Sequence, residues 1–262
     1  MMIQLNAICS GTRALASGAG TLLHYSSKAI NLDFKSRVIT LLNRDGLLTP
    51  SSIILDADLL ERIEGAFIHR GNLSSSRFSV IIENPVDLKL HLHDGVDRTF
   101  AERTLRGHLR QRERSIINAL LSILGEEVAP SESWLETVVL RDQIRSLDGN
   151  DVMGLASNLL GKGFGLTPSG DDFILGVVSI MDLFGKDVST LRRLIDTYRN
   201  AFSRTVLGDA LDGYYPRPLL SVLNSLASNT GADCSVATLL KMGHTSGHDV
   251  LAGMYYATWK LV

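Results

Sequence analysis

The stretch "GKGFGLTPSGDDFILG", residues 161–176, joins a glycine-rich loop to an apolar segment. Three glycines in five residues cost backbone entropy, so they are most useful where the chain needs positive φ angles or where a ligand approaches the backbone closely. Ser169 has the residue type of an N-cap, and Asp172 stands three residues later, as in a variant capping box. We therefore expect a helix over residues 169–183 whose first turn is capped by Ser169.

A second stretch, "KMGHTSGHDVLAG" at residues 241–253, repeats the same pattern. The series Ser169-Gly170-x-Asp172-x-x-x-Gly176 matches Ser246-Gly247-x-Asp249-x-x-x-Gly253 position for position. In both, the last glycine falls one turn after the aspartate, on the same helix face. Small residues there let two helices approach closely. We predict that both helix N-termini line one cleft, with the Cα atoms of the two serines within ~20 Å.

The chain as a whole places strands before helices. Short apolar or alternating runs bounded by turn residues predict strands at residues 29–34, 37–42, 51–56, 78–83 and 87–92. After residue 97 the period becomes helical, and we expect helices at about 98–125, 131–147, 169–183, 188–207, 218–227 and 246–261. The predicted fold class is α+β, with a mostly antiparallel β-sheet or small barrel over residues 1–97 and a helical domain over 98–262. No low-complexity linker separates the two, so we expect them to pack together.

Composition and charge exclude several classes of protein. The formal net charge of −2 gives no electrostatic footprint for nucleic acid. Only Cys9 and Cys234 occur, which excludes a disulfide framework and zinc-ligand spacing and indicates a reduced, cytoplasmic setting. No segment has the uninterrupted apolar length of a membrane span, and the N-terminus does not read as a signal peptide.

The two helix starts combine features of an anion site with carboxylates. Helix N-termini and glycine loops favour anions, and Lys162 adds a positive charge, although the residue order is not that of a P-loop. Asp171, Asp172 and Asp249 would repel an anion unless they cap their helices, hold a cation or accept N–H bonds from a urea-like ligand. A ligand with an anionic end and an N–H-rich end satisfies both features. His244 is either an acid or base in this cleft or a structurally satisfied histidine.

The stretches "GKGFGLTPSGDD" and "GHTSGHD", with "AINL" at residues 29–32, resemble the AllH family of bacteria. The resemblance covers most of the chain. It implies a part in oxamate carbamoyltransferase, where an AllH-type subunit acts with FdrA-type and AllG-type subunits in allantoin (purine) nitrogen catabolism. Oxalurate and phosphate would there give oxamate and carbamoyl phosphate, and oxalurate carries a carboxylate at one end and a ureido group at the other. Phe164 departs from the proline of the family's motif, which leaves the loop less rigid.

We therefore predict a cytoplasmic subunit of a carbamoyltransferase complex that binds a small ureido acid and phosphate. The predicted catalytic residues are His244, Asp171, Asp172 and Asp249. The predicted substrate-binding residues are Lys162, Gly163, Gly165, Thr167, Ser169, Gly170, Thr245, Ser246 and Gly247. No tightly held metal or other cofactor is expected, although the aspartates are compatible with weak Mg²⁺ binding.

Two other functions stay open at this point. One is a non-catalytic partner subunit that binds a metabolite without transforming it. The other is a stand-alone hydrolase that uses the aspartates on Mg²⁺ or Mn²⁺. No set of nucleophile, base and orienting residue is readable from the sequence, which disfavours an enzyme that works alone.

Overall fold

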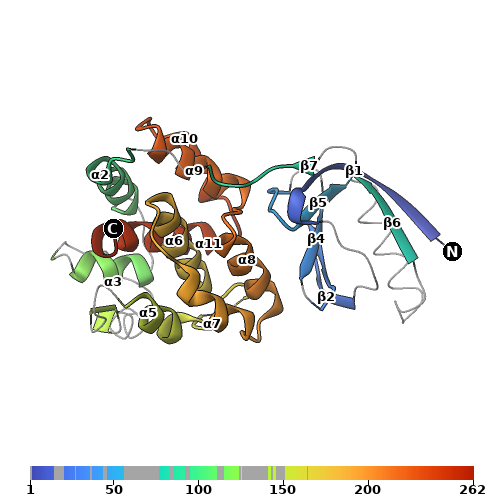
Figure 1. Ribbon diagram of the computed structural model, residues 1–262, viewed down its shortest axis with the longest axis horizontal. Helices are drawn as coiled ribbons and strands as arrows, with labels where there is room; N and C mark the ends of the chain where they lie inside the picture. Colours follow the sequence, from blue (N-terminus) through green and yellow to red (C-terminus); the bar gives the residue numbers. More distant parts are fainter. Residues whose placement is uncertain are drawn as a thin grey trace.

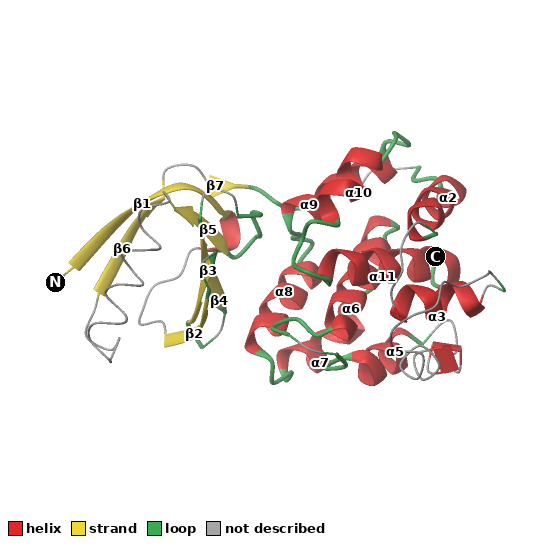
Figure 2. Ribbon diagram, turned by 180° about the vertical axis from the view of Figure 1, so that it is seen from behind, coloured by secondary structure: helices red, strands yellow, loops and turns green. Residues whose placement is uncertain are grey.

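The computed structural model separates a β-sheet, which contains the N-terminus, from a group of helices that contains the C-terminus (Figure 1). The structure describes residues 2–14, 21–26, 28–35, 37–43, 46–55, 77–82, 85–91, 95–110, 115–123, 125, 141–142, 144–145, 151–163 and 165–262. Strands and helices do not alternate along the chain (Figure 2). The predicted α+β class is therefore confirmed.

The strands form one mixed sheet in the order β2-β3-β4-β5-β1-β6, and β7 also pairs with β1. Their bounds are β1 Met2–Gly11, β2 Thr21–Tyr25, β3 Ala29–Asp33, β4 Val38–Leu42, β5 Ser52–Leu55, β6 Arg77–Ile82 and β7 Pro85–Val86. The pairs β2–β3, β3–β4 and β1–β5 are antiparallel. The pairs β4–β5, β1–β6 and β1–β7 are parallel. The sheet is thus more parallel than expected, because alternation predicts which side chains share a face but not the direction of the neighbouring strand.

Both faces of β5 are covered, since all four of its residues are buried. Ile53 and Leu55 pack on one face in a cluster with Ile39 and Leu41 of β4. Ile54 points to the other face, into a cluster that also contains Leu48 and Leu88 and contacts Leu220 of the helical part. This second face therefore turns toward the helices.

The strand expected over residues 87–92 is wrong for residues 87–91, which form only an isolated bridge between Lys89 and Tyr214. The alternation there has another cause. The backbone of this segment pairs with a turn of the helical part, with bonds from Leu90 N to Gly213 O (2.8 Å) and from Tyr215 N to Leu88 O (3.1 Å). Leu88 and Leu90 are consequently buried as they would be in a strand.

The helices are α2 Arg98–Leu109, α3 Ser115–Ile123, α5 Val152–Leu159, α6 Ser169–Leu183, α7 Arg192–Asp196, α8 Ala201–Leu211, α9 Arg217–Ala227, α10 Asp233–Leu239 and α11 Ser246–Lys260. The structure also has short 3₁₀ turns, η1 Thr12–Ala14 and η3 Ser189–Leu191. The bounds of α6 agree with the prediction, and those of α9 and α11 differ by one residue. The expected helix over 188–207 is instead divided, because Asn200 caps α8 by accepting bonds from Phe202 N and Ser203 N. Most of the helix expected over 131–147, and the link between α2 and α3, lie outside the described residues.

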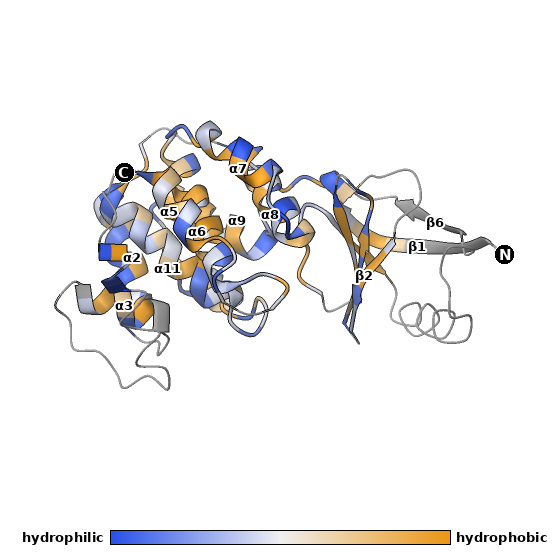
Figure 3. Cartoon of the chain, turned by 90° about the horizontal axis from the view of Figure 1, so that it is seen from below, coloured by the Kyte–Doolittle hydropathy of each residue, from blue (hydrophilic) through white to orange (hydrophobic). Residues whose placement is uncertain are grey.

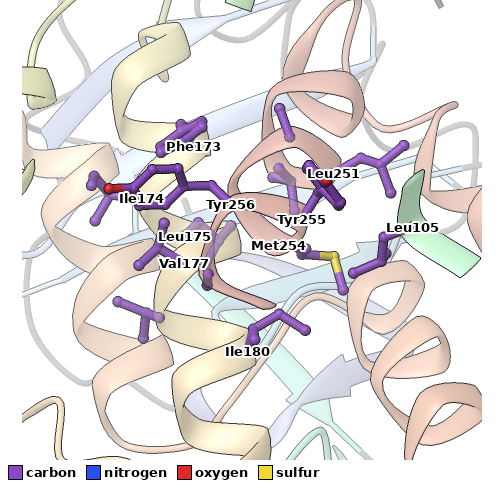
Figure 4. Close-up of a cluster of buried hydrophobic side chains, with 14 of the residues drawn as sticks. Leu105, Phe173, Ile174, Leu175, Val177, Ile180, Leu251, Met254, Tyr255 and Tyr256 are labelled. Carbon is purple, nitrogen blue, oxygen red and sulfur yellow. The ribbon is translucent and has the colours of Figure 1, made fainter. Parts of the chain in front are cut away.

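Helices α6 and α11 form the centre of the helical part. Thirteen of the 15 residues of α6 and 11 of the 15 residues of α11 are buried. A helix that is buried all round needs apolar partners on every side, and apolar residues gather at this centre (Figure 3). Figure 4 shows Phe173 and Ile174 of α6 beside Tyr256 of α11. None of the helices in the described part of the chain is both long and apolar enough to cross a membrane.

The two helices touch through their glycines, as predicted. A Cβ added to Gly176 would lie 2.1 Å from the carbonyl oxygen of Val250, and one added to Gly253 would lie 1.9 Å from that of Phe173. The contact is reciprocal, because Phe173 follows Asp172 and Val250 follows Asp249. The backbones therefore meet directly one residue after each aspartate.

The sheet and the helices are joined by buried polar contacts around Asp209 of α8. Its Oδ1 accepts bonds from Arg13 Nε (3.1 Å) and Arg37 Nη1 (2.8 Å), and its Oδ2 accepts one from Ser51 Oγ (2.6 Å). Val38 N also donates to Thr205 Oγ1 at 2.8 Å. The two parts pack together as expected, while their separation into domains at residue 97 stays a prediction.

We expect Gly253→Ala to destabilise the fold by about 3 kcal/mol or more, because the new methyl group would overlap a backbone carbonyl that cannot move aside. Gly107→Ala is the matched control, since Gly107 also lies inside a helix and a Cβ there meets nothing within 4 Å. The control should gain about 0.5–1 kcal/mol. Urea unfolding of the three proteins measures both effects, and equal stability of the two variants would contradict the tight crossing.

Candidate functional site

The two Ser-Gly-x-Asp motifs belong to a repeated helix-loop-helix unit. In the first unit α5 leads into α6, and in the second α10 leads into α11. A Cβ on Gly170 would lie 1.9 Å from the carbonyl oxygen of Leu159, and one on Gly247 would lie 2.1 Å from that of Leu239. The end of each first helix therefore packs on the start of the second.

The loops of the two units also repeat their backbone bonds. Lys162 N donates to Leu159 O (3.0 Å), and Gly170 N donates to Lys162 O (2.8 Å). The second unit has the same pair of bonds: Met242 N donates to Leu239 O (2.9 Å), and Gly247 N donates to Met242 O (3.0 Å). In each loop the next residue is a glycine of positive φ, at 110° for Gly163 and 60° for Gly243. The sequence "LLGKG" at 159–163 thus corresponds to "LLKMG" at 239–243.

The predicted capping by Ser169 is wrong. Helix α6 has Pro168 as its N-cap residue, and no side chain caps it. Helix α11 likewise begins after Thr245 without a side-chain cap. The carbonyl oxygen of Pro168 accepts bonds from Asp171 N and Asp172 N, and that of Thr245 accepts bonds from His248 N and Asp249 N. Both serines therefore fall inside the first turn of their helix. The aspartates are therefore not explained by capping.

The two helix starts lie side by side, joined by a contact of 3.3 Å between Thr167 Oγ1 and Ser246 Oγ. Thr167 is only two residues from Ser169. Two residues of chain and two short side chains span less than ~20 Å, so the predicted proximity of Ser169 and Ser246 is confirmed. The helix starts meet at this contact instead of facing each other across an open gap.

Asp171 is a buried carboxylate with well-defined partners. Its Oδ1 accepts a bond from Gly161 N at 2.7 Å, and the Tyr198 hydroxyl donates to the carboxylate at 3.0–3.2 Å. Burial, followed by the charge of Asp171, raises the pKa of Tyr198, so this hydroxyl stays protonated. Asp171 thereby ties the glycine loop to the segment after α7, which gives it a positioning role.

Asp172 is also buried, but only part of its carboxyl group is hydrogen-bonded. Asp172 is only 3% exposed, and its Oδ2 receives no hydrogen bond from any described residue. The pKa of Asp172 is raised to about 8, mainly by burial. Hydrogen bonds from Ser246 and Thr167 oppose this shift, while the nearby charges of Asp249 and Asp171 add to it. The carboxyl group of Asp172 is therefore mostly protonated at neutral pH.

Asp249, the counterpart of Asp172, is also buried, at 1% exposure. The structure thus brings together Asp171, Asp172 and Asp249 beneath the contact between Thr167 and Ser246. Two neighbouring carboxyl groups away from water do not both ionise readily, and one then holds a proton near neutral pH. Such a group can act as a general acid or base.

The predicted residues that flank this contact lie at the surface. Lys162, Gly163, Gly165 and His244 are exposed, while Thr167, Ser169, Thr245 and Ser246 are partly exposed. The structure brings no described aspartate into a salt bridge with Lys162 or His244, so their roles remain predictions. Gly170 and Gly247 are buried at the helix contacts already described, and they position backbone where a Cβ would not fit. Phe164 lies outside the described residues.

Within the described ranges, no three side chains of His, Cys, Asp or Glu gather closely enough to hold a metal ion. The expectation that no transition metal is tightly held stays a prediction, and so does weak Mg²⁺ binding by the aspartates.

Two residues of this region were not anticipated from the sequence. Tyr198 binds Asp171, and Asn200 Nδ2 donates to Leu166 O at 2.8 Å while the same side chain caps α8. Both lie in the connection between α7 and α8, some 30 residues from the glycine loop. No local pattern marks them, because their partners are defined by tertiary packing.

Comparison with known families gives one match. A family model described as oxamate carbamoyltransferase subunit AllH matches residues 159–258. The matched range begins at Leu159, the last residue of α5, and includes both helix starts and most of α11. It supports an AllH-like assignment, in agreement with the resemblance of the two motifs. No solved structure matches the chain.

The raised pKa of Asp172 predicts a specific dependence of stability on pH. The folded protein keeps this proton up to about pH 8, whereas the unfolded chain loses it near pH 4. Stability should therefore fall as the pH rises between these values, by at most ~1.4 kcal/mol per unit. Asp172→Asn, which cannot ionise, should gain a few kcal/mol on the wild type between pH 5 and pH 9.

Urea unfolding at pH 5, 7 and 9 measures this difference. The control is Asp151→Asn, because Asp151 caps α5 through a 2.7 Å bond from Gly154 N and asparagine is an equally good cap. The control should keep a constant difference from the wild type. A constant difference for Asp172→Asn as well would contradict a protonated Asp172.

Proposed function

We propose, on the premise that residues 159–258 are AllH-like, that this chain is a subunit of an oxamate carbamoyltransferase that binds an oxalurate-type ureido acid at its paired helix starts. The family name supports the coarser statement, a subunit of an oxamate carbamoyltransferase, and a subunit implies partner subunits. The substrate, the place in allantoin nitrogen catabolism and the cytoplasmic location are parts of the proposal. The expected partners are an FdrA-type and an AllG-type subunit.

The observation that carries the proposal is the buried carboxyl group of Asp172 beside Asp249. Its raised pKa, about 8, places a proton donor in the physiological range. Thr167 and Ser246 both interact with this carboxyl group, touch each other and are partly exposed. Their hydroxyl groups therefore offer a path for a proton between the buried acid and a ligand at the surface.

The reaction needs such a proton. An oxygen of phosphate forms a bond to the ureido carbon of oxalurate, and the bond from that carbon to the oxamate nitrogen breaks. Oxamate leaves as a neutral amide only if its nitrogen gains a proton, which Asp172 supplies through Ser246. The reverse reaction returns the proton to Asp172 along the same path.

The exposed groups around the contact have complementary roles in binding. Lys162 and the positive-φ backbone of Gly163 and Gly165 attract the carboxylate end of the substrate, together with the N-terminus of α6. His244, which is exposed before α11, contacts the ureido end or the incoming phosphate in this proposal. The unequal loops of the two units then distinguish the two ends of the ligand.

Asp172→Asn and Asp249→Asn should each lower kcat of the reconstituted complex by about 100-fold or more, the usual loss when a general acid is removed. The assay is phosphate-dependent breakdown of oxalurate by the purified subunits together. Asp151→Asn is again the matched control and should retain activity, since its carboxylate only caps α5.

The same variants need a test of folding and assembly. Both variants should still co-purify with the partner subunits, because asparagine resembles the protonated aspartate in shape. The melting temperature should not fall, and that of Asp172→Asn should rise at neutral pH with its predicted gain in stability. Full activity of both variants would contradict the proposed proton path. If the chain binds oxalurate but the reconstituted complex shows no phosphate-dependent breakdown of it, a non-catalytic metabolite-binding subunit is favoured instead.

The chain alone should show little or no carbamoyl transfer. In the described structure the candidate proton donor is buried, and the matched family is described as a subunit of a larger enzyme. Assay of the isolated subunit against the assembled complex, at equal concentration, measures the dependence on partners. Robust turnover by the single chain would overturn the multi-subunit proposal.

A further inference from the structure

A polar cleft lies between the sheet and the helical part, and its lining includes none of the residues at the paired helix starts. Its volume is about 490 Å³, within the range of small-molecule sites. Five cationic side chains line it: Arg13, Lys35, Arg37, Arg192 and Arg204. They come from η1, the turn between β3 and β4, α7 and α8. The cleft is therefore built by both parts of the chain.

The charge of this cleft is opposite to that of the whole protein. Its two acidic lining residues, Asp196 and Asp212, leave a formal excess of three positive charges, whereas the whole chain has a net charge of −2. The buried Asp209, which pairs with Arg13 and Arg37, neutralises one more positive charge. A cleft lined by one sign of charge focuses the field and concentrates ions of the opposite sign.

The ion pairs within the cleft use only some of the N–H donors of its cationic side chains. Arg13 binds Asp209 and Asp212, and Arg192 binds Asp212. Arg37 uses Nη1 for Asp209, Ser51 and the carbonyl of Arg13, and Arg204 uses Nη1 for the carbonyl of Tyr198.

In the part of the chain that the structure describes, the remaining guanidinium nitrogens of Arg37, Arg192 and Arg204 and the ammonium of Lys35 have no acceptor. Guanidinium groups bind phosphate oxygens with paired N–H donors.

The backbone keeps Lys35 at the rim of the cleft. Its φ is 69°, in the left-handed region, and its N–H donates to Asp33 Oδ1 at 2.7 Å. Positive φ is uncommon for a residue other than glycine and costs energy. This turn therefore holds an exposed lysine beside Arg37, near cations of α7 and α8 that repel it.

We propose that this cleft binds a small molecule that carries a phosphate group. The excess of positive charge suits an anion of two or more charges, and the volume exceeds the need of a single phosphate ion. The inference does not rest on the proposed carbamoyl transfer, because it uses none of the residues at the helix starts.

Isothermal titration calorimetry of the folded chain, in a buffer free of phosphate, tests the proposal with inorganic phosphate, pyrophosphate and malonate as probes. Pyrophosphate should bind more tightly than malonate, and its affinity should fall with added salt. Lys35→Asn, which keeps a residue type that tolerates positive φ, and Arg204→Gln should each weaken pyrophosphate binding about three- to tenfold.

Two further variants make the result decisive. Lys186→Asn, at an exposed lysine outside the cleft, should bind pyrophosphate as the wild type does. Asp172→Asn, at the helix starts, should also leave this affinity unchanged. No binding of pyrophosphate, tighter binding of malonate, or equal affinity of all variants would overturn the proposal. Weakening by Asp172→Asn alone would move the phosphate to the helix starts and overturn it as well.

Discussion

The direct contact between the backbones of α6 and α11 is the constraint on which the site depends. The carbonyl oxygens of Phe173 and Val250 occupy the space where side chains at Gly253 and Gly176 would begin. Neither helix can slide or rotate without a clash, because packed interiors transmit strain instead of absorbing it. Each carbonyl belongs to the residue after an aspartate, so the crossing also fixes Asp172 and Asp249 in one buried region. Their shared burial then keeps a proton on Asp172 near neutral pH.

A second set of contacts determines what covers these carboxyl groups. The C-terminal ends of α5 and α10 pack against Gly170 and Gly247, so both loops fold back over the helix starts. The hydroxyl groups of Thr167 and Ser246 meet as a result. The polar loop residues therefore lie at the surface, and the acids lie below them. On the far side of α8, the ion pairs of Asp209 attach the sheet and complete the cationic cleft.

The sequence was informative where a feature depends on local pattern. The bounds of α6, the glycine contact and the proximity of the two serines all follow from a short motif that occurs twice. The cap at Ser169 was wrong because Pro168 takes the N-cap position, a one-residue shift that the pattern does not resolve. The roles of Tyr198 and Asn200, and the ion pairs of Asp209, depend on residues far apart in the chain. Leu88 and Leu90 alternate as in a strand but pair with a turn, since alternation reports burial and not the partner.

The two units differ in the length of the loop before the second helix. Six positions separate Gly163 from Ser169, whereas three separate Gly243 from Ser246. The third residue of each motif also differs, being Asp171 in one and His248 in the other. Two identical units would bind a molecule equally well in either of two opposite orientations. If the reaction takes place at only one end of the molecule, half of the binding events would then be unproductive. The extra residues of the first loop remove this symmetry, so that a ligand bound across the two units, as proposed, would have one preferred orientation.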